Sequence, residues 1–246
     1  MSYSHNEVKP YEASEQNKTK QVSKMFDNIA PYYDFLNRFL SLGIDTIWRK
    51  KAIKQLAEIK PKNVLDVATG TADMALEIWK QVAPDKIMGI DISARMLEVG
   101  QKKIDKKQLG EKIELKLEDS ENLSFEGNTF DAVSVAFGVR NFENLEKGLE
   151  EIYRVLRKGG RLVVLEFSKP TIFPFKQIFQ FYFRNILPFI GRFTSKDPKA
   201  YRYLYESVQA FPDGKDFEEV LRKTGFTTTK IIPLSLGICS IYLGEK

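Results

Sequence analysis

The sequence is poor in the side chains that build most metal sites and most covalent catalytic sites. Its 246 residues include one cysteine, Cys239, and one histidine, His5. One residue of each kind cannot form an intrachain disulfide, a zinc site or a Cys–His nucleophile pair. We therefore expect no resident metal and no catalysis by imidazole, and the single cysteine fits a cytoplasmic setting.

Long apolar runs are missing as well. No stretch approaches the roughly 18 apolar residues of a transmembrane helix, and the start, MSYSHNEVKP, lacks the cationic and apolar parts of a signal peptide. Hydrophobic residues make up 43% of the chain and charged residues 29%, which is ordinary for a soluble globular protein. The length suits one α/β domain, or one such domain with a sizeable insertion.

Positive charge is scarce except in one segment. The chain has a net charge of +5, but residues 169–202 hold seven Lys or Arg and one acid, a net charge of +6, so the rest sums to −1. A local basic segment in an otherwise neutral protein favours a local contact over a nucleic-acid-binding surface.

The chain divides into three parts by pattern. Residues 1–18 are polar without periodicity, which predicts a disordered or loosely attached tail. Apolar residues at helical spacing predict a helical cap over 19–60, broken near Pro31 and Gly43. Residues 61–246 form the main domain, and its segment 169–210 is an aromatic-rich, helical insertion that we expect to cover the substrate.

The main domain alternates between predicted strands and helices. Strands are predicted at 63–68, 86–91, 112–117, 129–136, 160–167, 227–232 and 238–244, and helices at 71–82, 94–108, 143–156 and 215–224. Repeated strand–helix–strand units imply a largely parallel sheet with right-handed crossovers. The fold class is therefore α/β, a Rossmann-like seven-stranded sheet with helices on both faces.

The ends of the first three strands carry acids instead of a glycine-rich phosphate loop. The stretch VLDVATGTAD has one glycine, Gly70, where a dinucleotide site needs the G-x-G-x-x-G spacing. Asp91 closes the second strand, and Asp119 and Ser120 follow the third. Because ligands of such sheets sit beyond the carboxyl ends of the strands, the ligand side is predicted to be acidic.

An acidic pocket favours S-adenosylmethionine, which has a ribose, an adenine and a sulfonium cation but no phosphate. Asp91 is expected to bind the ribose hydroxyls and Asp119 the adenine amino group. Gly70 and Thr71 let the methionine portion approach, and Asp66 adds a further carboxylate. The interpretation rests on several features at successive strand ends.

Structural alternatives stay open for two of these acids. In the alternative, Asp66 caps the helix region that follows it, and Asp91, followed by Ile-Ser, is the N-cap of the next helix.

Six stretches carry a family resemblance: MFDNIAPYYDFLNRFLSLGIDTIWRK (25–50), VLDVATGTAD (64–73), GIDIS (89–93), EDSENLSF (118–125), FGVRNFEN (137–144) and RVLRKGGRLVVLEFSKP (154–170). From about Val22 to the C-terminus the sequence resembles the ubiquinone/menaquinone biosynthesis C-methyltransferases. The first stretch, with YD-x-x-N and S-x-x-x-x-x-x-W, and the last are specific. The second and third occur in most class I methyltransferases.

The resemblance implies a class I S-adenosylmethionine-dependent methyltransferase that methylates a ring carbon of a polyprenylated quinol. Demethylmenaquinol is the first choice of substrate, the methoxy-benzoquinol of the ubiquinone route the alternative, and RNA or protein a remoter one. Carried over by position, the cofactor residues are Thr71, Asp91, Asp119 and Ser120.

Three positions depart from the family pattern. Ala72 stands where a third small turn residue is usually glycine, and Asp45 stands where histidine is common. That histidine is therefore not essential here. Ala136 occupies a place where some relatives have a serine, and we assign it no role.

Such a reaction needs a cation near the substrate oxygen. A quinol ring carbon becomes nucleophilic when a neighbouring hydroxyl loses its proton, and a nearby cation stabilises the oxyanion. Arg140 follows the fourth strand and is the candidate, with Asn141 beside it and Tyr33 closing over the ring. In the alternative, Arg140 pairs with Glu166 or Glu143 and Asn141 caps the helix that follows.

The insertion fits a lipid-tailed substrate at a membrane surface. Lys176, Arg184 and Arg192 are expected to face anionic headgroups at the inner face of the membrane. The alternative is packing against the core or against a second subunit, which implies a homodimer. The side chains expected to line a prenyl tunnel are Phe173, Phe175, Phe179, Tyr182, Phe183, Ile186, Leu187 and Phe189.

Overall fold

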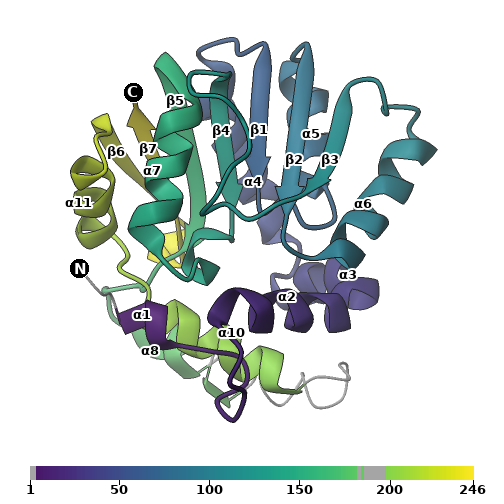
Figure 1. Ribbon diagram of the computed structural model, residues 1–246. Coiled ribbons are helices and arrows are strands. Elements are labelled where there is room, and N and C mark those ends of the chain that lie inside the picture. Colours follow the sequence, from purple (N-terminus) through teal and green to yellow (C-terminus); the bar gives the residue numbers. More distant parts are fainter. Residues whose placement is uncertain (1–3, 182–183, 186–197) are drawn as a thin grey trace.

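A seven-stranded sheet forms the centre of the structure, a computed structural model that describes residues 4–181, 184–185 and 198–246 (Figure 1). The strands lie in the order β3-β2-β1-β4-β5-β7-β6, and each overlaps a predicted segment. Their bounds are β1 Asn63–Val67, β2 Lys86–Asp91, β3 Ile113–Leu117, β4 Phe130–Ala136, β5 Leu156–Phe167, β6 Thr227–Leu234 and β7 Cys239–Glu245.

The strand order reverses between β1 and β4. The chain runs from β1 outward through β2 to β3, then returns to the other side of β1 for β4 and β5, all in parallel. Only β7 is antiparallel to its neighbours β5 and β6. In open α/β sheets the ligand crevice lies at the carboxyl ends of the strands, where the order reverses. The carboxyl ends of β1 and β4 therefore mark the expected site.

Helices cover both faces of the sheet, which confirms the predicted fold class. The helices α4 (Ile44–Ala57) and α5 (Asp73–Val82) pack on one face, and α7 (Leu145–Val155) and α11 (Lys215–Lys223) on the other. The fully buried side chains that dock them include Ile53, Leu56, Ala75 and Ile78 on the first face and Leu149, Ile152, Phe217 and Leu221 on the second. Burying one large apolar side chain contributes about 1.5–3 kcal/mol, so tertiary packing holds these helices.

A third layer of helices lies beyond the carboxyl ends of the parallel strands, at the bottom of Figure 1. It joins segments that are far apart in the sequence: α1 Ser4–Glu7, α2 Lys18–Ile29, α3 Tyr33–Leu40, α8 Phe175–Phe181 and α10 Pro198–Ala210. The short 3-10 helix η1 (Ala30–Tyr32), which contains Pro31, separates α2 from α3, and Gly43 at φ +77° precedes α4. Both breaks occur where the sequence predicts them.

The N-terminal segment is not a loose tail over its described residues. His5 and Lys18 are fully buried, and the Lys18 Nζ donates a hydrogen bond of 2.6 Å to the carbonyl oxygen of His5. The main chain of Tyr11 donates to the Gln21 Oε1 at 2.9 Å. The sequence-based expectation of a loosely attached tail is therefore wrong here, because side chains of α2 hold this segment against the molecule.

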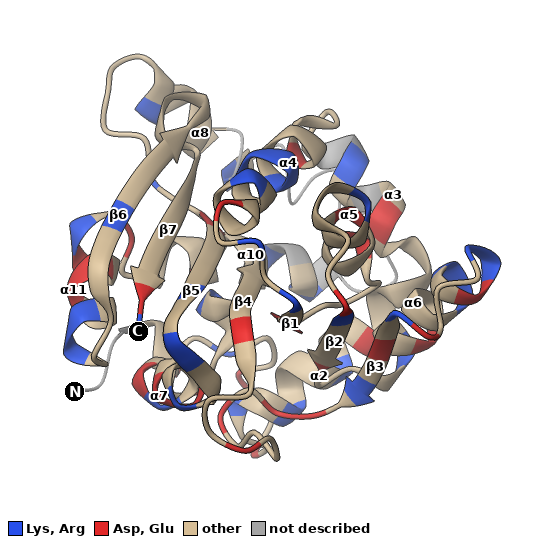
Figure 2. Ribbon diagram, turned by 90° about the horizontal axis from the view of Figure 1, so that it is seen from above, with Lys and Arg blue, Asp and Glu red and all other residues tan. Residues whose placement is uncertain are grey.

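Charge is mixed over the outer helices. Each of α6 (Ala94–Lys106), α7 and α11 carries both basic and acidic residues, as Figure 2 shows. Among the described residues, no helix is both long and apolar enough to cross a membrane.

Candidate active site

The turn between β1 and α5 is built from residues in the left-handed region. Ala68, Gly70 and Ala72 have φ values of +53°, +56° and +62°. Non-glycine residues rarely adopt this conformation, and it clusters at ligand sites. The main-chain N–H of Thr69 donates to the carbonyl oxygen of Ile90, so the turn is fixed to β2.

Asp66 lies beneath this turn. Its carboxylate accepts hydrogen bonds of 2.6 Å from the hydroxyls of both Thr69 and Ser134, and its side chain is fully buried. Burial raises the pKa of Asp66 to about 6. Asp66 lines neither of the two cavities described below, and it does not cap α5, whose N-cap Ala72 has no side-chain hydrogen bond. Its two contacts instead hold the turn on β4.

Asp91 ends β2 and faces the smaller cavity. Its Oδ2 accepts from the main-chain N–H of Gly70 and its Oδ1 from that of Ser93, both at 2.8 Å. Burial raises the pKa of Asp91 to about 6, while these N–H donors act in the opposite direction. The N-cap of α6 is Ser93, whose hydroxyl accepts from the Met96 N–H. Asp91 is therefore not the N-cap of this helix, as the structural alternative proposed.

The smaller cavity, of about 60 Å³, contains acids and no cationic side chain among the described residues that line it. The predicted residues Gly70, Asp91, Asp119 and Ser120 come together here, and Glu118 joins them. Glu118 pairs with Lys116 at 3.0 Å, outside the lining. The carboxylates of Asp91 and Asp119 repel a pyrophosphate and favour a cationic, phosphate-free ligand. The donor set therefore fits S-adenosylmethionine, as the sequence predicts.

Thr71 does not line either cavity. Its hydroxyl donates to the Asp34 Oδ1 at 2.5 Å, and the Asp34 Oδ2 pairs with Lys103 at 2.5 Å. Lys103 also contacts Asp73 at 2.6 Å. These contacts tie α3 of the helical cap to the turn and to α6.

Arg140 and Asn141 lie on the short 3-10 helix η2 (Val139–Asn141), directly after β4. The Arg140 Nη1 pairs with the fully buried Glu166 at 2.7 Å and donates to the Phe137 carbonyl oxygen at 2.6 Å. This is one of the two pairings that the sequence left open. The Arg140 Nε is buried and has no hydrogen-bond acceptor among the described residues.

Asn141 does not cap α7. That cap is Asn144, whose side chain accepts from the Lys147 N–H. The Asn141 Oδ1 instead accepts a hydrogen bond of 3.1 Å from the Tyr203 hydroxyl on α10. Asn141 thereby links η2 to α10, the last helix of the insertion.

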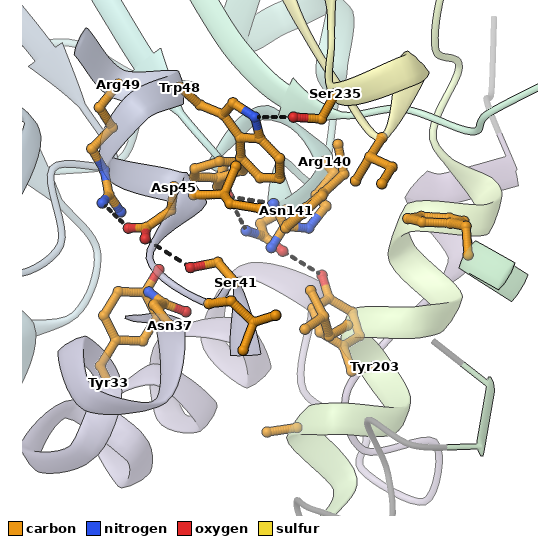
Figure 3. Close-up of a pocket in the computed structure, with 18 of the residues that line it drawn as sticks. Tyr33, Asn37, Ser41, Asp45, Trp48, Arg49, Arg140, Asn141, Tyr203 and Ser235 are labelled. Atoms are coloured by element: carbon orange, nitrogen blue, oxygen red, sulfur yellow. Dashed lines mark hydrogen bonds and ion pairs between the residues drawn. The ribbon is translucent and has the colours of Figure 1, made fainter. Parts of the chain in front are cut away.

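A larger cavity of about 330 Å³ opens beside the smaller one (Figure 3). One part of its lining is polar and includes all three predicted catalytic residues, Tyr33, Arg140 and Asn141. The rest is apolar and includes Phe175, Ile178 and Phe179 on α8 and Leu204 on α10. Such a cavity fits a ligand with a polar ring and an apolar tail.

Of the residues predicted to line a prenyl tunnel, the structure places only some beside a cavity. Phe175 and Phe179 line the larger cavity, whereas Phe173 is 77% exposed and does not. The predicted Tyr182, Phe183, Ile186, Leu187, Phe189 and Arg192 lie outside the described residues.

Sequence reasoning missed a row of polar side chains from α3, α4 and the turn between them. The missed residues are Asn37, Ser41, Asp45, Trp48 and Arg49, which all line the larger cavity. A signal for them was present, because Asn37 and Ser41 follow Tyr33 at steps of four residues, and Trp48 and Arg49 follow Asp45 at three and four residues, which is helical spacing on each side of the break at Gly43. The specific motifs YD-x-x-N and S-x-x-x-x-x-x-W contain three of them. Tyr203 and Ser235 were missed without any such signal.

The two cavities share a wall. Phe26, Tyr33, Phe137 and Asn141 line both of them. A ligand in one cavity therefore lies next to a ligand in the other, which is what transfer of a group between two bound molecules requires.

The sheet order, the acidic turn site and the paired cavities define the class I methyltransferase fold. A solved S-adenosylmethionine-dependent methyltransferase from Thermotoga maritima has this fold, with a TM-score of 0.62, 20% identity and coverage of 91% of this chain and 99% of that one. The chain belongs to the ubiE/COQ5 methyltransferase family, whose model matches residues 14–246.

Relatives in this family are similar along the whole chain. Demethylmenaquinone methyltransferase of Bacteroides fragilis is 47% identical over 246 residues, the full length of both chains. Ubiquinone/menaquinone biosynthesis C-methyltransferase UbiE of Geotalea daltonii is 44% identical over 230 residues, which are 93% of this chain and 97% of that one. The predicted family is confirmed.

Proposed function

We propose that the protein methylates a ring carbon of a polyprenylated quinol, with demethylmenaquinol as the preferred substrate. The observation that carries the proposal is the wall shared by two cavities: an acidic one whose described lining has no cationic side chain, and a largely apolar one that Arg140 lines. The name of the Bacteroides fragilis relative supports the menaquinone route. The name of the Geotalea daltonii relative keeps the ubiquinone route as the alternative.

The smaller cavity would hold S-adenosylmethionine, which supplies an electrophilic methyl group when bound. Asp91 would accept from the ribose hydroxyls, held in place by the N–H groups of Gly70 and Ser93. Asp119 would accept from the adenine amino group, and Ser120 lies beside it in the cavity lining. Thr71 acts in this proposal through the turn, which it ties to Asp34.

The polar part of the larger cavity would hold the quinol ring. The Arg140 Nε would donate to the oxygen beside the reacting carbon and stabilise the negative charge that develops there. Asn141 and Tyr33 lie in the shared wall and would orient the ring toward the methyl group. A guanidinium keeps its proton, so Arg140 stabilises the oxyanion without acting as the base.

The mouth of this cavity would meet an anionic membrane at the inner face. Leu42, Ile44 and Ile178 line the cavity and are still 85%, 38% and 59% exposed. Phe173 at 77% and Phe181 at 61% add exposed apolar surface from the same insertion as Ile178. A cluster of exposed large apolar residues marks an interaction site, and a prenyl tail has to enter from lipid.

Methyl transfer from labelled S-adenosylmethionine tests the reaction. We expect label in reduced demethylmenaquinone, less or none in the methoxy-benzoquinol, and none in the oxidised quinones, whose ring carbons are not nucleophilic. Binding of the cofactor without labelling of either quinol would refute the substrate and leave the fold and the family unaffected.

A further inference from the structure

The larger cavity holds one carboxylate for which the proposed function has no use so far. Asp45 is the sole Asp or Glu among the described residues that line this cavity. Methylation at carbon needs a group that takes the proton of the quinol hydroxyl.

The other titratable side chains in the lining are poor acceptors. They are Tyr33 from α3, Arg49 from α4, Arg140 from η2 and Tyr203 from α10. A guanidinium has no accepting atom. Burial raises the pKa of both tyrosines, so both keep their protons at neutral pH. Asp45 is the remaining group with a lone pair and a negative charge.

The Asp45 carboxylate is fixed by two partners and can still accept a proton or a further hydrogen bond. The residue is 4% exposed, its Oδ1 accepts from the Ser41 hydroxyl at 2.7 Å, and its Oδ2 pairs with Arg49. Each carboxylate oxygen has a second lone pair. Figure 3 shows Asp45 between Arg49 and Ser41, with Tyr33 and Asn37 of α3 close by.

An aromatic pair connects Asp45's partner with the proposed oxyanion site. Phe137 and Phe167 lie with their ring centroids 4.8 Å apart. The Arg49 guanidinium lies over Phe137 at 5.9 Å, and that of Arg140 over Phe167 at 5.5 Å. A flat ring that packs against this pair therefore has Arg140 near one ring and the Asp45–Arg49 pair near the other.

We propose that Asp45 is the catalytic base, an assignment that rests on the proposed quinol methylation. The hydroxyl proton moves to a carboxylate oxygen of Asp45, and the O–H electron pair stays on the ring oxygen. The ring carbon then forms a bond to the methyl group, and the S–CH₃ pair returns to sulfur as a neutral thioether. The carbon loses its proton to water, and Asp45 returns its proton to the ring oxygen. One proton is released in total.

A purely structural role for the Asp45–Arg49 pair makes different predictions. It would tie two turns of α4 together, and its loss would lower activity equally at every pH and for every quinol. A base gives a loss that shrinks when the substrate ionises more easily, because less proton transfer is then needed.

The test compares Asp45→Asn with Asp45→His at saturating cofactor. General-base catalysis contributes about 10²–10⁴-fold, so Asp45→Asn should lower kcat for demethylmenaquinol at least about 100-fold at pH 7. Raising the pH, or adding an electron-withdrawing ring substituent, should restore part of that loss. Asp45→His should retain more activity than Asp45→Asn, with an acid limb at higher pH, because imidazole gains its proton at a higher pH than a carboxyl group does.

Two further variants separate a lost base from a damaged fold. Asp45→Asn combined with Arg49→Met leaves no unpaired buried charge and should show the same dependence on pH and substrate acidity as Asp45→Asn. Asp131→Asn breaks an Asp–Arg pair with Arg157, lines neither cavity and should leave methyl transfer unchanged. Affinity for S-adenosylhomocysteine, measured by calorimetry, should be the same in all variants.

The outcomes separate this assignment from the proposed function. An Asp45→Asn enzyme that matches the wild type, or a deficit that is constant over pH and substrate acidity, refutes the base while quinol methylation stands. A wild-type protein that binds cofactor and labels no quinol refutes both.

Discussion

At the residue scale, Asp66 and Asp91 show that the position of a side chain decides whether it has a structural role or faces a ligand cavity. They lie on neighbouring strands, and burial raises the pKa of both to about 6. Asp66 is bonded to the hydroxyls of Thr69 and Ser134, whereas Asp91 faces the smaller cavity. The sequence predicts a cofactor contact for both, because both lie near strand ends. It does not show which side chain is buried under the turn and which one faces the cavity.

Asp91 makes a testable prediction for cofactor binding. Hydrogen bonds to a charged group contribute about 1.5–3 kcal/mol each, so Asp91→Ala should weaken binding of S-adenosylmethionine at least tenfold in calorimetry. Affinity in the wild type should also fall as the pH drops through about 6, because protonation removes an acceptor for the ribose hydroxyls.

Asp91→Asn is the matched control for the pH effect. It keeps the shape of the side chain and cannot titrate, so its affinity should be low and nearly independent of pH. Any dependence that remains would come from Asp66, which titrates in the same range. Unchanged affinity in Asp91→Ala would contradict the assignment.

Arg140 should affect turnover more than cofactor binding. Loss of one donor to a developing oxyanion costs about 10²–10³-fold in kcat, so Arg140→Ala should lower kcat by that order and leave cofactor affinity nearly unchanged. Because Arg140→Ala also leaves Glu166 buried without its cation, the double variant with Glu166→Gln is needed as a control. Equal losses in turnover and cofactor affinity would indicate a structural role.

At the scale of elements, the sequence predicts where helices begin and end better than it predicts which face of a helix lines a cavity. The breaks near Pro31 and Gly43 were predicted and are present. The cavity-lining face of α3 and α4 was not predicted, although its spacing is helical. In the sequence, the polar residues Asn37, Ser41 and Asp45 look solvent-exposed; the folded chain places η2 and α10 around the cavity that they line.

The N-terminal segment was mispredicted for a related reason. Its anchors are contacts over long sequence distances that no periodicity reveals. The Lys18 Nζ donates to the Arg140 carbonyl oxygen at 3.4 Å, and the Thr19 hydroxyl donates to Glu143 at 2.9 Å. The segment therefore packs against η2, the element that carries the proposed oxyanion donor.

Lys18 makes the docking of this segment dependent on pH. Burial lowers the pKa of Lys18 to about 7, although Glu121 and Glu143 act in the opposite direction. A free lysine titrates near 10.5, so the docked segment binds fewer protons than the undocked one between pH 7 and 10.5. Docking should therefore strengthen as the pH rises through this window, and it should not change with Lys18 protonation below pH 7.

Limited proteolysis within residues 4–17 measures this effect. Cleavage of the wild type should be slower at pH 9 than at pH 7, after correction for the activity of the protease on an unfolded peptide. Lys18→Met removes the titrating group and should abolish the difference, and Lys20→Met, which changes an exposed lysine, should preserve it. The same pH dependence in Lys18→Met would rule out this explanation.

At the scale of the whole molecule, the alternation of strands and helices was enough to predict the sheet and its two helical faces. The last two strands, β6 and β7, were predicted as well, whereas their antiparallel pairing is seen only in the structure. The larger cavity was beyond such reasoning, because α3, α4, η2, α8 and α10 all contribute to it. Only the folded chain brings these five elements together around one space.

The exposed mouth of that cavity gives the prediction for the molecule as a whole. Apolar side chains that enter the lipid and basic side chains near the headgroups both favour an anionic bilayer, the latter by about 1 kcal/mol each. The protein should therefore sediment with anionic vesicles at low salt, and less with neutral ones. Leu42→Glu combined with Phe173→Glu should lower the bound fraction at least about tenfold, since each change removes an apolar contact and adds a repelled charge.

Leu117→Glu is the matched control, because Leu117 is 59% exposed at the end of β3 and does not line the larger cavity. It should sediment like the wild type. Methyl transfer to a short-chain, water-soluble quinol should survive in the double variant, since that substrate does not have to enter from lipid. The membrane proposal is wrong if the wild type stays in the supernatant of the vesicle assay. If analytical ultracentrifugation then shows a dimer that Leu42→Glu dissociates, the mouth is an interface between two copies of the chain.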